Sequence, residues 1–146
     1  MHAGRTAAAA VLTTAILVTG GCRASAERGV SARLRLVVVD NHVRAEGDEC
    51  AGARPYRYVH AGAPFSVEAE DETVLVEGEL PPGRAENADP SIEWGVERFP
   101  TVCVIDLTVD DLPPRPRYLV RLPEGAPLAF EVPTGARDEP IVLIVQ

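Results

Sequence analysis

The sequence contains no lysine, so all 14 of its basic residues are arginines, and they stand against 22 acidic residues. The formal net charge of −8 does not fit the basic patch that a nucleic-acid-binding surface requires. We therefore expect no nucleic-acid partner. Aromatic residues are also scarce, with a single tryptophan in the chain. An aromatic side chain that falls in a loop is therefore a candidate anchor for a binding partner.

The chain also lacks an apolar run long enough to span a bilayer. Residues 7–18 form a stretch of 12 residues without a charge, whereas a membrane-spanning helix needs about 20. Arg5 precedes this stretch, and the small residues Thr19, Gly20 and Gly21 follow it. This layout is typical of a secretory signal. We predict that residues 1–21 form a helical signal peptide.

Residues 17–22, Leu-Val-Thr-Gly-Gly-Cys, resemble the lipobox of bacterial lipoproteins. The resemblance implies that Cys22 is diacylated on sulfur and becomes the new N-terminus. The protein would then lie on the extracytoplasmic face of the bacterial cell membrane, held there by its lipid. The alternative is an ordinary signal peptide cut after Ala26, because residues 24–26 have the small-x-small form, and a secreted protein.

Only two cysteines, Cys50 and Cys103, remain after Cys22. Two cysteines in an exported chain most simply form one disulfide. The alternatives are a metal-binding pair and a reactive thiol, but no histidine or further cysteine stands near either residue at ligand spacing. We therefore expect a disulfide, no metal site and no cofactor.

Long helical patterns are also missing, whereas 13 prolines and 12 glycines punctuate the chain. Alternating or wholly apolar segments separated by turn residues predict strands at 33–40, 64–70, 73–80, 101–110, 118–122, 128–132 and 141–145. Such spacing favours an all-β fold, a small antiparallel β-sandwich of about seven strands, immunoglobulin-like or transthyretin-like. We expect residues 22–31 to be the lipid-anchor cysteine and a flexible tether, and 32–146 to be the single domain.

Details of this expected sandwich follow from individual segments. Asp40-Asn41 is a turn signal, after which residues 42–46 either continue the first strand or form a hairpin partner. Residues 64–80 form the best candidate hairpin of the chain. Residues 81–100 are expected to be one long irregular loop. Residues 141–145 are apolar on both faces, as a covered strand would be.

A wider pattern begins at the second cysteine. Residues 50–58 read Cys-x-Gly-x-x-Pro-Tyr-x-Tyr. Cys103 opens the segment 103–107, and Tyr118 lies in the next expected strand. The set resembles a group of small secreted or lipid-anchored actinobacterial domains of unknown function. The resemblance implies a β-domain with a disulfide between Cys50 and Cys103, and it implies no activity.

Three aromatic residues are the candidate partner-binding residues. Trp94 lies in the long loop, and Tyr56 and Tyr58 lie near Cys50. The structural alternative for Trp94 is that it folds back to cap an open end of the sandwich.

Catalytic and metal-binding patterns are weak by comparison. His42 and His60 could be combined with a serine on paper, but no Gly-x-Ser-x-Gly motif exists. The acidic cluster Glu68, Glu70, Asp71 and Glu72 lacks the pattern of a calcium loop, so we interpret it as a solvated strand face.

These observations lead to a functional expectation. We expect no catalytic residues and no enzyme, but an exported, lipid-anchored cell-surface protein that acts as a non-catalytic binding or structural module. Its partners would be the membrane, through the lipid on Cys22, and an envelope protein or polymer. The alternative is an enzyme or metal-binding envelope protein whose site has no recognisable motif.

Overall fold

The computed structural model describes residues 29–133 and 139–146, and these residues contain nine β-strands and no helix. The predicted signal peptide, the lipidation at Cys22 and most of the predicted tether lie outside the described residues. The strands are β1 Val30–Ala45, β2 Glu49–Cys50, β3 Pro64–Glu68, β4 Val74–Glu79, β5 Gly83–Asn87, β6 Arg98–Leu112, β7 Tyr118–Arg121, β8 Leu128–Phe130 and β9 Ile141–Val145.

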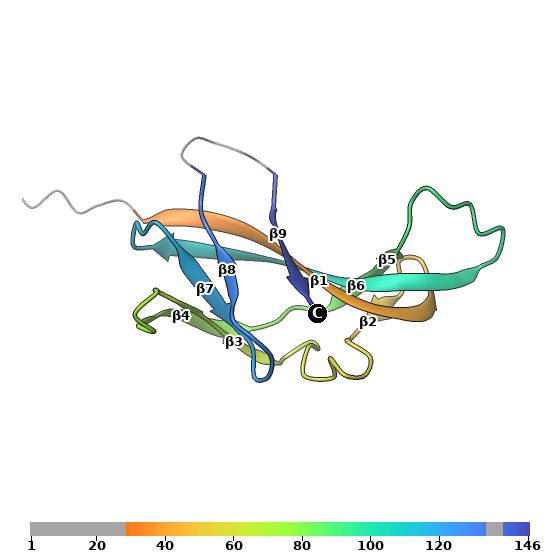
Figure 1. The fold of residues 1–146 in the computed structure, drawn as a ribbon, viewed down its shortest axis with the longest axis horizontal. Coiled ribbons are helices and arrows are strands. Elements are labelled where there is room, and N and C mark those ends of the chain that lie inside the picture. The colour runs from red at the N-terminus through yellow and green to blue at the C-terminus, as the bar shows by residue number, and fades with distance from the viewer. Residues whose placement is uncertain (1–28, 134–138) are drawn as a thin grey trace, which may run out of the picture.

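The strands form two sheets, which confirms the prediction of a small all-β sandwich (Figure 1). One sheet has the strand order β2-β5-β6-β1-β9, and the other has the order β4-β3-β7-β8. Neighbouring strands are antiparallel except β1 and β9, which run parallel. The described residues therefore contain two strands more than the seven expected, and one parallel pair in an otherwise antiparallel fold.

The core lies between the sheets, where the predicted inward faces meet. Cys103, Ile105 and Val109 of β6 are buried, as are Tyr118 and Val120 of β7. Leu107, expected on the same inward face of β6, is only partly buried. The fully buried side chains are Tyr118, Leu34, Leu36, Ile105, Leu112, Val38, Val59, Val67, Val109, Val120, Thr101 and Cys103. Burying each large aliphatic side chain of this kind contributes about 1.5–3 kcal/mol, so the alternating pattern fixes which face of each strand turns inward.

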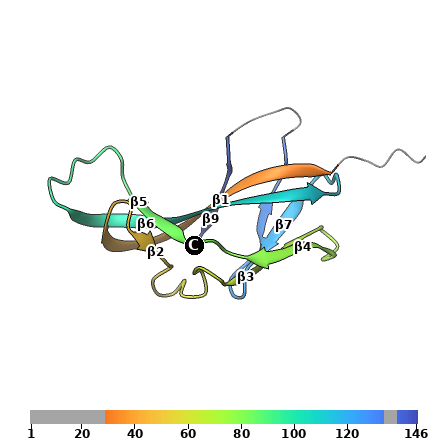
Figure 2. The same ribbon diagram turned by 180° about the vertical axis from the view of Figure 1, so that it is seen from behind.

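The strands β1 and β6 form a long two-stranded ribbon that organises the whole molecule. β1 has 16 residues and β6 has 15, and they pair from Val30↔Leu112 to Ala45↔Arg98. One half of the ribbon packs over the four-stranded sheet, and the other half carries β5 and β2 beyond it (Figures 1 and 2). A strand of this length spans about 50 Å, so its two ends are far apart.

The ribbon stays continuous because Asp40-Asn41 forms a bulge rather than a hairpin turn. The register shifts between Val38 and His42, and Asn41 has a φ of 47°. Asparagine tolerates this left-handed conformation better than most residues. Of the two alternatives for residues 42–46, the structure shows that the strand continues as far as Ala45.

The expectation of one long irregular loop over residues 81–100 is wrong in two places, because residues 83–87 form β5 and β6 begins at Arg98. β5 pairs with β6 on one side and with β2 on the other. Gly83 is required there, since a Cβ at this position would lie 2.7 Å from the sulfur of Cys103. Ala85, the next inward residue, is fully buried. The part of β5 beside the disulfide therefore carries only small inward residues. The irregular segment shrinks to residues 88–97.

Two expectations at the ends of the domain also need correction. β9 is an edge strand of the five-stranded sheet, with Leu143 and Val145 buried but Val142 and Ile144 exposed by 53 % and 41 %. It is therefore covered on one face, not on both. At the other end, β1 begins at Val30, so the last two residues of the expected tether belong to the sheet. Within the described residues no helix is long and apolar enough to cross a membrane.

The hairpin at 64–80 is confirmed as β3 and β4, but its acidic side chains are not all solvated. Glu68 is 5 % exposed, and its carboxylate accepts hydrogen bonds from the Nε–H of Arg121 at 2.9 and 3.0 Å. The Oγ–H of Ser66 also donates to it. The interpretation of Glu68 as part of a solvated face is therefore wrong, because an arginine on β7 lies opposite it and pairs with it.

Candidate functional site

The disulfide predicted between Cys50 and Cys103 is present and joins β2 to β6. It lies directly before the segment 51–63, which Figure 1 shows below the ribbon between β2 and β3. Gly52 N–H donates to Val59 O at 2.7 Å, and Val59 is fully buried. The disulfide and these contacts hold the segment 51–63, which contains no strand, in one place.

Tyr56 and Tyr58 belong to this segment, and both rings are partly buried against the core. A Cβ at Gly125, in the β7–β8 turn, would lie 2.6 Å from the Tyr58 hydroxyl, so the ring reaches that turn. Burial, with smaller effects from Tyr56 and Glu124, raises the pKa of Tyr58 above its ordinary value. The two tyrosines thus connect the disulfide segment to the sandwich.

Trp94 lies in the segment 88–97, at the far end of the ribbon from the start of β1 (Figures 1 and 2). Its ring stacks on Phe99 of β6, with ring centroids 6.1 Å apart and planes inclined by 1°. Its Nε1–H donates to Asn87 Oδ1 at 3.1 Å, and the same oxygen accepts from the N–H of Asp89. Trp94 therefore folds back, not onto an open end of the sandwich, but onto the β5–β6 extension.

A hollow of ≈ 640 Å³ surrounds this stack, and we call it the Trp94 groove. It is lined by Glu46, Asn87, Pro90, Ile92, Glu93, Trp94, Gly95, Val96, Glu97 and Phe99. Ile92 and Val96 are 42 % and 60 % exposed, and no described element covers them. The groove therefore combines an aromatic stack fixed by hydrogen bonds, two exposed aliphatic side chains and three glutamates.

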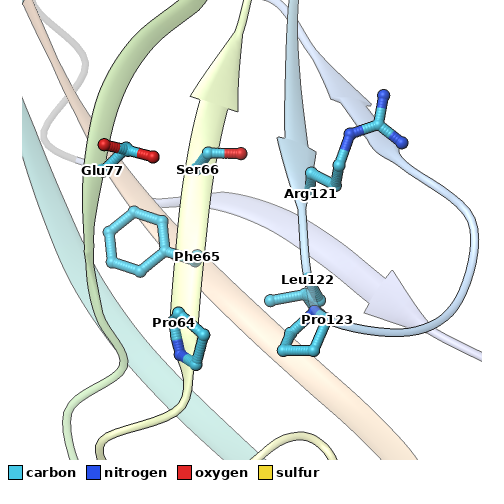
Figure 3. Close-up of a pocket in the computed structure, with 7 residues that line it drawn as sticks. All are labelled: Pro64, Phe65, Ser66, Glu77, Arg121, Leu122 and Pro123. Atoms are coloured by element: carbon cyan, nitrogen blue, oxygen red, sulfur yellow. The ribbon is translucent and has the colours of Figure 1, made fainter.

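A smaller hollow of ≈ 200 Å³ lies over β3 and β7 (Figure 3). It is lined by Pro64, Phe65, Ser66, Glu77, Arg121, Leu122 and Pro123, and Figure 3 shows the Arg121 head group pointing away from the Phe65 ring. Arg121 and Ser66 are both engaged with Glu68, and the hydrogen bond from Arg121 holds the pKa of Glu68 below its ordinary value. Two of its three polar side chains, Ser66 and Arg121, are already bonded within the protein, so this hollow is the weaker candidate.

The histidines and serines that could have formed a catalytic group do not come together. His60 Nδ1 is 2.8 Å from Ala61 O, whereas the hydroxyls of Ser66 and Ser91 are bonded to Glu68 and Asp89. In residues 29–133 and 139–146, no hydrogen bond joins a histidine ring to a serine. No group of three His, Cys, Asp or Glu side chains in this part of the chain could hold a metal ion.

Of the three aromatic candidates, the structure assigns Trp94 to a groove and the two tyrosines to a different part of the fold. The sequence did not indicate Phe99, Asn87 or Glu46 as neighbours of Trp94. Glu46 follows the end of β1, far from residue 94 in sequence, and the β1–β6 pairing brings it there. The chain matches no known protein family, no curated protein and no solved structure.

Proposed function

We propose that this protein is an exported, lipid-anchored, non-catalytic binding module that presents the Trp94 groove away from the membrane. One observation carries the proposal. The segment 88–97, which supplies most residues of the groove, and the start of β1 lie at opposite ends of the long β1–β6 ribbon (Figures 1 and 2). A lipid on Cys22, eight residues before Val30, would place the membrane at the end away from the groove.

The disulfide supports the extracytoplasmic location. Bonds of this kind persist in oxidising compartments and are rare in the cytosol, where thiols are kept reduced. Cys103 is fully buried, and the bond ties the segment 51–63 to the ribbon. A fold that uses a disulfide in this way suits a chain that is exported through a signal peptide.

The construction of the groove supports a binding role. Binding sites often combine exposed apolar surface with an aromatic residue, and binding energy concentrates on tryptophan and other aromatic residues. The stack on Phe99 and the hydrogen bond to Asn87 hold the Trp94 ring in place before any partner arrives. Such pre-ordering reduces the entropy lost on binding.

A reconstitution experiment tests both the anchor and the orientation. Protein purified in detergent from cells that export it is returned to phosphatidylcholine vesicles. It should float with the vesicles, its N-terminal peptide should carry a diacylglyceryl group on Cys22, and Cys22→Ser should not float. Trp94 is the only tryptophan, so its fluorescence reports on the groove alone. The neutral quencher acrylamide should reduce the emission, and brominated lipid should not.

Two results would contradict the proposal. Flotation of Cys22→Ser would show that the cysteine is not the anchor. Quenching by brominated lipid in the anchored protein would show that the groove faces the bilayer.

A further inference from the structure

We infer that the Trp94 groove binds a cationic peptide segment, one in which arginine or lysine stands beside apolar side chains. This inference rests on the proposed binding function and names its partner class. It starts from the three glutamates that line the groove, Glu46, Glu93 and Glu97.

The three carboxylates come from two separate segments that meet at the groove. Glu46 follows β1, whereas Glu93 and Glu97 flank Trp94 in the segment 88–97. All three side chains are exposed, and none forms an ion pair with any described residue. By contrast, Glu68, Glu86 and Asp106 on the sheets are each paired with an arginine. The groove therefore has a rim of three carboxylates that form no ion pair within the described part of the fold.

The remaining lining residues favour a peptide that carries apolar side chains beside its positive charge. Ile92 and Val96 offer exposed aliphatic surface, and the Trp94 ring, backed by Phe99 on one face, offers the best aromatic surface for a cation. An arginine or lysine can lay its apolar stem along such surface while its charged head reaches a carboxylate. A peptide that alternates basic and apolar side chains satisfies both parts of the groove.

Charge also decides against other occupants. The chain carries a net charge of −8, so a second copy would bring an acidic surface to an acidic rim. Anionic lipids and acidic envelope polymers would be repelled in the same way. A positively charged partner is attracted by the rim and by the chain as a whole.

Fluorescence anisotropy with a synthetic peptide tests the inference. The probe is a labelled peptide in which Arg alternates with Leu and Phe, and the reference probe has Gln in place of each Arg. The full chain with its disulfide oxidised should bind the Arg peptide more tightly than the Gln peptide, and added salt should weaken the binding. The double variant Glu93→Gln/Glu97→Gln should weaken it by roughly tenfold, because each exposed ion pair contributes up to about a factor of five.

A matched variant separates the groove from general acidity. Glu79→Gln/Glu131→Gln removes the same charge from exposed positions in the sandwich half of the fold, and should leave the affinity unchanged. Equal loss in both double variants would overturn the inference in favour of non-specific attraction. Equal binding of both peptides, abolished by Trp94→Ser, would keep the groove as a binding site and overturn the partner class. No binding of either peptide would also overturn the inference. The binding function itself is tested separately, by photo-crosslinking in intact cells with a photo-reactive amino acid in place of Val96.

Discussion

Replacing Cys103 with alanine is expected to lower the melting temperature by roughly 15 °C or more. The disulfide closes a loop whose ends are 53 residues apart, for which chain entropy alone predicts about 4 kcal/mol. Cys103 is also fully buried beside Gly83, so the substitution removes packed atoms as well. Without the bond, the segment 51–63 loses its covalent connection to the ribbon.

Thermal unfolding of Cys103→Ala measures this effect, and Cys22→Ser is the control. Cys22 precedes the domain in the sequence, so its replacement should leave the melting temperature nearly unchanged. Native, unreduced protein should also show no reaction of Cys50 or Cys103 with an alkylating reagent. Alkylation of either residue, or a melting temperature for Cys103→Ala within a few degrees of the parent, would contradict the role of the bond.

Asp40→Asn is expected to cost about 3–5 kcal/mol of unfolding free energy, because it leaves the buried Arg44 without its counter-charge. The Asp40 side chain is 0 % exposed and that of Arg44 is 9 % exposed, with Arg44 Nη2 2.6 Å from Asp40 Oδ2. Arg44 also donates to Thr101 Oγ1 and Ala51 O, and Asp40 accepts from Ala53 N–H. One ion pair thus joins the β1 bulge, β6 and the disulfide segment.

The matched control is Asp106→Asn, which removes the exposed ion pair between Arg35 of β1 and Asp106 of β6. Exposed pairs contribute about 1 kcal/mol or less, so urea denaturation should separate the two variants clearly. A similar small loss in both would mean that the Asp40–Arg44 pair does not hold the bulge.

The same pair should make the protein sensitive to acid. Burial by itself raises the pKa of Asp40, but hydrogen bonds from Arg44 and Ala53 outweigh it and hold the pKa below its ordinary value. The unfolded chain, with a pKa of about 3.9 at this residue, therefore takes up the proton more readily. The stability that Asp40 contributes is complete above that pH and is lost as the pH falls through the lower pKa of the folded chain. In urea denaturation at a series of pH values, the loss should be smaller in Asp40→Asn.

The sequence predicts the parts of this fold that depend on alternating apolar residues. The inward faces of β6 and β7 and the β3–β4 hairpin follow from period-two patterns, and the disulfide follows from the number of cysteines. β5 has no such pattern, because its inward residues Gly83 and Ala85 are small to make room for the disulfide. No local signal shows that small residues will face a sulfur atom about 20 residues further along the chain.

The continuity of β1 is hidden for a different reason. Asp40-Asn41 has the composition of a turn, and only a distant partner decides between a turn and a bulge. Ala53, 13 residues away, supplies that partner by donating its N–H to the Asp40 carboxylate, and Arg44 pairs with the same carboxylate. Tertiary contacts here override the local preference.

The candidate site is likewise predictable from the sequence only in part. A lone tryptophan in an expected loop was enough to single out Trp94. Its stacking partner Phe99, its hydrogen-bond acceptor Asn87 and the acidic rim residue Glu46 all depend on the β1–β6 and β5–β6 registers. Tyr56 and Tyr58 carried an equal sequence signal and lie elsewhere, because the disulfide holds their segment against the core.

Photo-crosslinking in intact cells tests the central claim, that the Trp94 groove is the binding surface. A photo-reactive amino acid replaces Val96, which is 60 % exposed in the groove, and in a second variant replaces Val142, which is 53 % exposed on β9. Irradiation should give a discrete higher-mass adduct from position 96 and none from position 142. Adding Trp94→Ser should abolish the adduct, since central aromatic residues typically carry about 2 kcal/mol or more of binding energy, whereas Trp94→Phe should retain part of it. The absence of an adduct from position 96, or the same adduct from both positions, would contradict the account.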